Sequence, residues 1–96
     1  LNTEPDQNKD IILDKELWNS FINKLDSLED SLITAIFKQA SFLIFISETS
    51  KVYIEFPKDF VMFKNILLES KKQWLPLLRE IFKESVNLIA TYQEDE

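Results

Sequence analysis

The 96-residue sequence contains no cysteine, no histidine and no glycine. Without cysteine and histidine the chain has no disulfides, thiolate nucleophiles, imidazole bases or usual zinc ligands. Without glycine, no glycine-rich loop can cradle a phosphate group. No apolar run approaches the ~20 residues that a membrane-spanning helix needs, and the longest uninterrupted one is Phe42 to Ile46. These absences argue against an enzyme, a cofactor, a bound metal and a membrane partner, and they favour a binding or scaffolding module.

The residues that are present predict one compact domain. Apolar residues make up 45% of the sequence and aromatic residues 12%, which is enough to build a core. The formal net charge of −6 makes nucleic acid a poor main partner, because like charges repel. The lack of cysteine is typical of an intracellular protein, so we expect a cytoplasmic location. Because the first residue is leucine, we also expect the chain to be a piece of a longer protein.

The two ends of the chain differ in composition from the middle. Residues 1–10 are polar and aperiodic, and we expect residues 1–13 to form a flexible linker, with Ile11–Leu13 as an alternative short fourth strand. Residues 93–96 form an acidic tail. Between these ends no second linker and no repeat is visible, so a single domain is expected over residues 14–92.

Two amphipathic helices are predicted in the first part of this domain. Asp14 is a plausible N-cap for the first helix, and Ser27 to Asp30 resemble a capping box that starts the second helix, which ends near Ala40. In both segments apolar residues recur three and four positions apart, which is the spacing of one helical face. The two stripes are Leu17, Trp18, Phe21, Ile22, Leu25 and Leu28, then Leu32, Ile33, Ile36, Phe37 and Ala40.

A pair of strands is predicted next. Residues 42–46 are apolar at every position, which is typical of a strand covered on both faces, although a continuing helix would have the same pattern. Residues 51–56 alternate, with Val52, Ile54 and Phe56 on one face. We expect the two strands to form an antiparallel hairpin, and because its loop lacks glycine we expect a connection longer than a two-residue turn.

The rest of the domain predicts a broken helix and a third strand. Helical stripes occupy residues 60–67 and 74–82, and the polar run 69–73 marks the joint between them. Pro76 must kink the second segment or lie in its first turn. Residues 85–92 alternate again and form a strand that lies beside either hairpin strand. The expected fold class is therefore α+β, in the order helix, helix, strand, strand, broken helix, strand, with helices packed on a three-stranded sheet.

This order resembles a known family. The likeness covers residues 14–92 and lies in Glu16–Trp18, the second helix ending near Ala40, Val52–Phe56, the helix Phe60–Leu67 and the strand Ser85–Leu88. Together these segments resemble the C-terminal domains of the gamma/tau subunit of bacterial DNA polymerase III. The resemblance implies a small KH-like fold and a non-catalytic role in DNA replication, in which the domain tethers the clamp loader to the replicative polymerase or helicase. The family's ATP-binding motifs have no counterpart here, so the resemblance supplies no catalytic residue.

Two aromatic residues are candidates for contact with a partner. Trp74 stands beside Pro76 at the predicted helix joint, and tryptophan is enriched in binding hot spots, although its place in a helical stripe favours the core. Tyr53 is the aromatic residue that we expect to be exposed, because its side chain lies opposite Val52 and Ile54.

Charged residues supply two further candidates, Lys71 and Lys72. They belong to residues 51–83, in which seven bases stand against four acids, a balance suited to an acidic partner or DNA but also to an ordinary solvated surface. Glu29 and Asp30 could hold a hard cation, yet no calcium-loop pattern surrounds them and helix capping is favoured. No catalytic, cofactor-binding or metal-binding residue is assigned.

Two alternatives to the replication tether remain open. The first is a single-stranded nucleic-acid-binding domain that uses the lysines together with strand aromatics, namely Phe42, Phe45, Tyr53 and Phe56. The glycine-framed loop of a KH-type RNA grip is excluded, since the chain has no glycine. The second is an acidic adaptor domain unrelated to replication. The oligomeric state is open as well.

Overall fold

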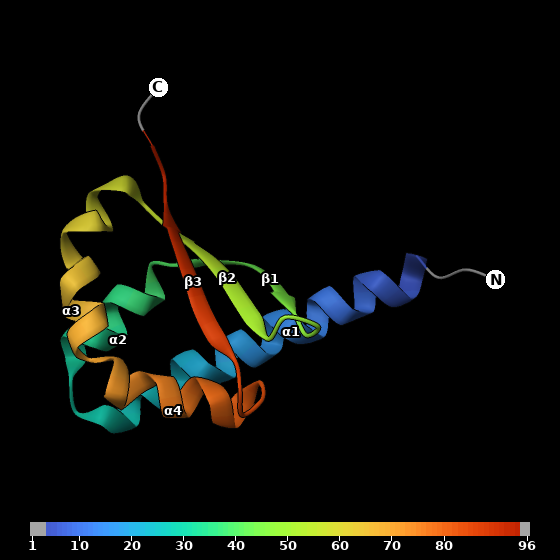
Figure 1. The fold of residues 1–96 in the computed structure, drawn as a ribbon, viewed down its shortest axis with the longest axis horizontal. Coiled ribbons are helices and arrows are strands. Elements are labelled where there is room, and N and C mark those ends of the chain that lie inside the picture. Colours follow the sequence, from blue (N-terminus) through green and yellow to red (C-terminus); the bar gives the residue numbers. More distant parts are fainter. Residues whose placement is uncertain (1–3, 95–96) are drawn as a thin grey trace.

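The computed structural model describes residues 4–94, with side chains from residue 14 onward. It contains α-helices, two 3₁₀ helices and one three-stranded sheet (Figure 1). The α+β class and the predicted order of helices and strands are confirmed. The elements are α1 (Glu4–Leu25), η1 (Asp26–Leu28), α2 (Ser31–Lys38), β1 (Ser41–Ile46), β2 (Lys51–Phe56), η2 (Lys58–Phe63), α3 (Lys64–Glu69), α4 (Lys71–Ile81) and β3 (Asn87–Tyr92).

The central strand of the sheet is β2, which pairs antiparallel with β1 and parallel with β3. The predicted hairpin is confirmed, and the four residues between its strands make the longer connection that the lack of glycine implied. The sequence did not determine which of the two hairpin strands the last strand pairs with. In the structure it pairs with β2. The last strand begins at Asn87 instead of the predicted residue 85, because Lys83 and Val86 close a turn in which the Val86 N–H donates to the Lys83 carbonyl at 3.1 Å.

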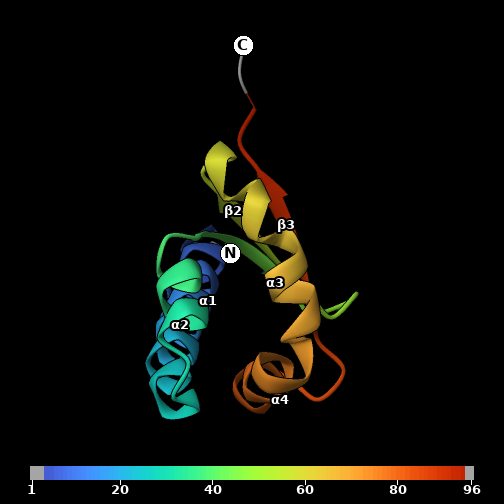
Figure 2. The same cartoon turned by 90° about the vertical axis from the view of Figure 1, so that its left-hand side faces the viewer.

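The helices α1, α2, α3 and α4 lie on one face of the sheet (Figure 2). Viewed along the sheet, α1 and α2 stand under one side and α3 and α4 under the other. The buried side chains that join them to the inner face of β2 form one core: Trp18, Phe21, Leu25, Ile33, Ile36, Phe37, Val52, Ile54, Phe56, Leu67, Trp74, Leu78 and Val86.

Phe37 of α2 is the centre of this core. Its ring centroid lies 5.2 Å from that of Trp74, 5.3 Å from Phe21, 6.1 Å from Trp18 and 6.3 Å from Phe56. The pairs with Trp18, Phe21 and Trp74 have the edge-on geometry that the charge distribution of aromatic rings favours, and the pair with Phe56 is tilted. One side chain therefore connects α1, α2, α4 and β2.

The first helix begins at Glu4, ten residues before the predicted start. The prediction of a linker is therefore wrong for residues 4–13, and so are the alternative strand at Ile11–Leu13 and the capping role of Asp14, which lies inside α1. A physical reason is visible in the sequence, since Pro5 is tolerated in a first helical turn, where its missing N–H costs nothing. The first turns of α1 project beyond the sheet (Figure 1). Residues 1–3 of the predicted linker, and residues 95–96 of the acidic tail, lie outside the described residues.

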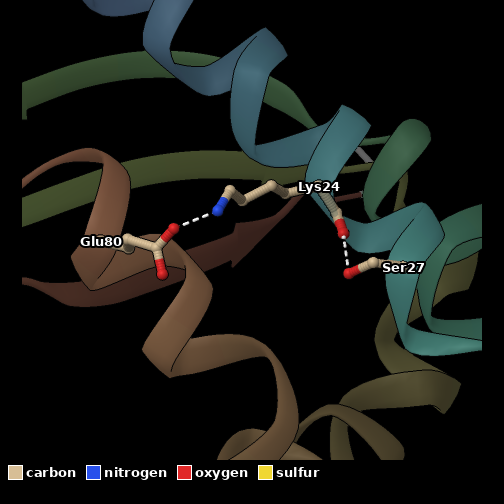
Figure 3. Close-up of polar contacts among 3 residues, drawn as sticks. All are labelled: Lys24, Ser27 and Glu80. Carbon is tan, nitrogen blue, oxygen red and sulfur yellow. Dashed lines mark hydrogen bonds and ion pairs between the residues drawn. The ribbon is translucent and has the colours of Figure 1, made fainter.

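Helix α2 is capped by Asp30 alone. Its Oδ1 accepts hydrogen bonds from the N–H groups of Leu32 at 3.1 Å and Ile33 at 3.2 Å. The predicted capping box starting at Ser27 is wrong, because that residue belongs to η1 and its hydroxyl donates to the Lys24 carbonyl at 2.7 Å (Figure 3). The chain turns between η1 and α2 at Glu29, whose φ of 59° is left-handed without the help of glycine.

Replacing the cap gives a first testable result. Asp30→Ala should lower the free energy of unfolding by about 1 kcal/mol, because two N–H groups at the start of α2 lose their acceptor. Urea unfolding measures this loss. Asp30→Asn serves as the matched control, since its side-chain oxygen can still accept both bonds, and it should retain most of the stability. Equal losses in the two variants would contradict the capping role.

The predicted joint in the last helical segment is confirmed at Ser70, between α3 and α4. The Ser70 hydroxyl donates to the Ile66 carbonyl at 2.8 Å, which closes the end of α3. Pro76 lies inside α4, so the chain breaks before the proline and not at it. An ion pair between Lys24 of α1 and Glu80 of α4 joins the two sides of the molecule (Figure 3). Its side chains are 45% and 59% exposed, so it contributes about 1 kcal/mol at most.

No helix of residues 4–94 lies on the outer face of the sheet, which corrects the expectation for β1. This strand was predicted to be covered on both faces, yet Leu43 and Ile44 are 48% and 42% exposed. The cause is its position at one edge of a sheet that has helices on a single face. An irregularity in pairing between Phe42 and Ile44 makes Leu43 an extra residue in the strand.

Candidate functional site

Three of the four predicted contact residues gather on one side of the molecule, where α3, α4 and β3 meet. A hollow of about 160 Å³ lies between these elements, and we call it the β3 groove. Apolar side chains from the inner face of β3 form one wall, and α3 with the start of α4 forms the other. The groove is lined by Lys64, Leu67, Leu68, Lys71, Trp74, Leu88, Ala90 and Tyr92.

Trp74 forms part of the floor of the groove and is not a projecting anchor. It is 4% exposed, its ring packs edge-on against Phe37, and its indole N–H donates to the Leu67 carbonyl at 2.9 Å. The prediction that Trp74 contacts a partner as a hot spot is therefore corrected, because almost no surface of this side chain is available. Trp74 is buried, as its place in the apolar stripe of the helix indicates, and its position near Pro76 does not expose it.

A second hollow lies on the other side of Leu68 and Lys71. It is wider, about 510 Å³, and it takes its lining from α3 and α4. Leu68 is 58% exposed and stands between the two hollows as an apolar ridge. The lining of the second hollow is Leu68, Glu69, Lys71, Lys72, Leu75, Pro76 and Arg79.

Positive charge borders both hollows. Lys64, Lys71, Lys72 and Arg79 stand against the single acid Glu69 in their linings, although the whole chain carries a net charge of −6. The Arg79 Nε donates to the Val86 carbonyl at 3.0 Å and holds α4 to the start of β3. The three lysines are exposed and are the charges available to a ligand.

The β3 wall of the groove is uncharged at neutral pH. The Tyr92 hydroxyl in this wall is protonated there, and burial raises its pKa further above its ordinary value. The Tyr92 ring stacks on Phe56, with 5.5 Å between the ring centroids. An apolar floor and a cationic border are thus combined in one concave surface.

Tyr53, the fourth predicted residue, lies on the opposite face of the sheet. It is partly exposed and sits in the middle of a row formed by Ile44, Tyr53 and Ile89, which pair across the three strands. The strand phenylalanines do not join it. Phe42 and Phe45 point inward and contact Phe82, and Phe56 is buried, so the aromatic platform suggested for single-stranded bases is not formed.

Sequence reasoning missed most of the groove. Lys64, Leu68 and the wall from β3 were not singled out, although the alternation of residues 85–92 already placed Leu88, Ala90 and Tyr92 on one face. The missing information was the neighbour of β3, because a strand pattern defines faces without defining which helices stand over them.

Other chemical sites are absent from the described part of the chain. Within residues 14–94 no group of three acidic, histidine or cysteine side chains is placed to hold a metal ion, and Asp30 uses its carboxylate to cap α2. Across the described backbone no helix has both the length and the apolar character needed to cross a membrane. Comparison with known protein families, with curated proteins and with solved structures found no match for this chain.

Proposed function

We propose that this chain is a non-catalytic protein-interaction domain, and that the β3 groove binds an acidic segment of a partner protein that also carries apolar side chains. The observation that supports the proposal is the apolar groove bordered by Lys64 and Lys71, with Lys72 in the adjoining hollow, on a chain whose overall charge is negative.

The two features of the surface have separate roles. Apolar ligand side chains that enter the groove are removed from water, at about 25 cal/mol for each Å² of buried surface. The lysines attract acidic residues, repel basic segments and set the orientation of the ligand. Since the rest of the chain repels anions, an acidic partner is directed to this surface in particular.

The resemblance to the gamma/tau subunit adds a specific partner to the proposal. On this reading the domain links a clamp loader to the replicative polymerase or helicase in the cytoplasm, and flexible tails act as the tethers. Tethering raises the effective concentration of the partner, so a moderate affinity suffices. A KH-like fold is part of the same proposal.

A titration at low and high salt tests this partner. The chain is mixed with the catalytic subunit of the replicative polymerase from the same source, and in parallel with single-stranded DNA. We expect polymerase binding that falls only modestly with salt, because the apolar contacts are not screened. Binding to DNA that falls steeply with salt, without polymerase binding, would favour a nucleic-acid-binding domain instead.

Charge reversal tests the groove directly. Lys64→Glu combined with Lys71→Glu should weaken partner binding at least about tenfold at low salt, because two attractive charges at the groove become repulsive. Lys15→Glu with Lys38→Glu is the matched control, since both lysines are exposed, lie away from the groove and give the same change in net charge. If the control pair weakens binding equally, the effect comes from overall charge and the groove is not the site.

A further inference from the structure

We infer that the partner segment binds as an additional β-strand on the free edge of β3, with alternate side chains in the β3 groove. This inference rests on the proposed function and specifies its mode of binding. Adding a strand to an exposed sheet edge is a recurring way to recognise peptides, in which main-chain hydrogen bonds give affinity and pockets for alternate side chains give specificity.

The backbone of β3 is oriented for this mode. The N–H of Asn87 donates to the Ser50 carbonyl at 2.8 Å, and the N–H of Gln93 donates to the Phe56 carbonyl at 2.9 Å. In a regular parallel ladder alternate residues face the same neighbour, so the odd-numbered residues of β3 bond to β2. The N–H and C=O groups of Leu88, Ala90 and Tyr92 therefore point to the free edge.

The same three residues line the groove. Their partners in β2 are Val52, Ile54 and Phe56, all buried on the inner face, so the side chains of Leu88, Ala90 and Tyr92 point inward as well. A strand placed beside β3 would continue this inner face and hold every second side chain above the groove, with α3 opposite. Lys64 and Lys71, on the helical wall, would then meet acidic residues of the ligand.

The edge of β3 lacks the features that usually protect such an edge. Natural edge strands carry charged residues, proline or bulges that prevent pairing with another chain. The sequence of β3, Asn87–Tyr92, contains no charge and no proline, and its six pairs with β2 run without a shift in register. The opposite edge, β1, is interrupted at Leu43 and packs beside α1. Of the two edges, β3 is thus the one open to a regular ladder.

The lysines at the groove favour an acidic partner segment over a second copy of this chain. Two copies joined through β3 would each cover a groove with the uncharged sequence of the other β3 and leave Lys64 and Lys71 without acidic neighbours from that strand. A partner segment with apolar residues at every second position and acids between or beside them satisfies the groove, the backbone edge and the lysines together.

The test uses a peptide selected on the whole chain. A library of random 12-residue peptides is displayed on phage and enriched for binders of the chain that do not bind the Lys64→Glu, Lys71→Glu variant, and the best peptide is synthesised. Two further versions are made in which alternate backbone nitrogens are methylated, one in each register. One register should lose affinity at least about tenfold and the other should stay within about threefold, because only alternate N–H groups of an added strand face β3.

Amide exchange followed by NMR locates the contact on the chain. With the unmethylated peptide bound, exchange at Leu88, Ala90 and Tyr92 should slow at least about tenfold, and exchange at Leu43 should not change. Shifted methyl signals of Leu67 and Leu88 without amide protection, or equal effects of the two methylated registers, would refute strand addition and leave the groove as a binding site. An absence of enriched peptides or of shifts at the groove would overturn both proposals. If these amides were protected in a dimer of the free chain, the strand added to β3 would come from a second copy of the chain, and the inference of a partner segment would be wrong.

Discussion

Phe37→Ala is expected to lower the free energy of unfolding by about 4 kcal/mol, a large share of the roughly 5–15 kcal/mol that stabilises a typical folded protein. Phe37 is fully buried, and its ring meets rings from α1, β2 and α4. The variant loses the transfer energy of the ring and leaves a cavity that four aromatic neighbours cannot fill without moving. Thermal unfolding measures the effect, at roughly 4–8 °C for each kcal/mol.

The control for Phe37 is an apolar residue of the open sheet face. Ile44→Ala removes a side chain that is 42% exposed and should cost much less, because little burial is lost and water fills the space. If Phe37→Ala melted within a few degrees of Ile44→Ala, the two sides of the molecule would not share one core.

Trp74→Ala is expected to have the second large effect, again about 4 kcal/mol of stability. The substitution removes the ring that packs on Phe37, and it also leaves the Leu67 carbonyl without its indole donor. That hydrogen bond crosses the joint between α3 and α4, so its loss loosens the two helices that form a wall of the groove. Urea unfolding measures the loss of stability. A binding titration on the fraction that remains folded measures the effect of the looser helices on the groove.

Trp74→Phe separates packing from hydrogen bonding at this position. Phenylalanine keeps most of the ring contact and cannot donate, so the loss should fall to about 1–2 kcal/mol. A Trp74→Ala variant as stable as the original chain would show that the tryptophan is a surface residue after all, and the interpretation of the groove floor would be wrong.

The two positions show how far the sequence alone leads. Phe37 and Trp74 both lie in helical stripes, and periodicity places both in the core. For Trp74 a second argument competed, since a tryptophan beside Pro76 at a helix joint also fits a binding hot spot. Burial prevailed, because the indole ring packs against Phe37 and its N–H is bonded to the Leu67 carbonyl of α3.

Element boundaries were harder to predict than element types. Helix α1 extends back to Glu4 through a polar stretch without an apolar stripe, and periodicity gives no signal in such a stretch. The start of α2 depends on one carboxylate at Asp30, three residues after the serine that the capping-box pattern favoured. The start of α2 is thus fixed by local hydrogen bonds at its N-cap, which a capping-box pattern in the sequence does not locate to the residue.

Local sequence patterns could not predict the order of the strands in the sheet. Residues 42–46 read as a strand covered on both faces because all five are apolar, and their exposure follows from β1 being an edge strand. Predicting the groove also requires knowing which strands are neighbours in the sheet. Lys71 was recognised from a basic stretch, but its position beside the β3 groove requires β3 to cross over and pair with β2.

This crossover has a consequence for how the domain folds and responds to its ligand. The β1–β2 hairpin closes through four residues, whereas Ser50 and Ser85, which precede β2 and β3 and meet through their hydroxyl groups, are 35 positions apart. Distant pairings cost more loop-closure entropy and form late, so we expect β3 to be the last element to dock and the first to detach. A ligand that binds only when β3 is docked then stabilises the folded domain. At a ligand concentration one hundred times the dissociation constant, this stabilisation is about 2.7 kcal/mol. Assembly into a complex and completion of the domain become one coupled event.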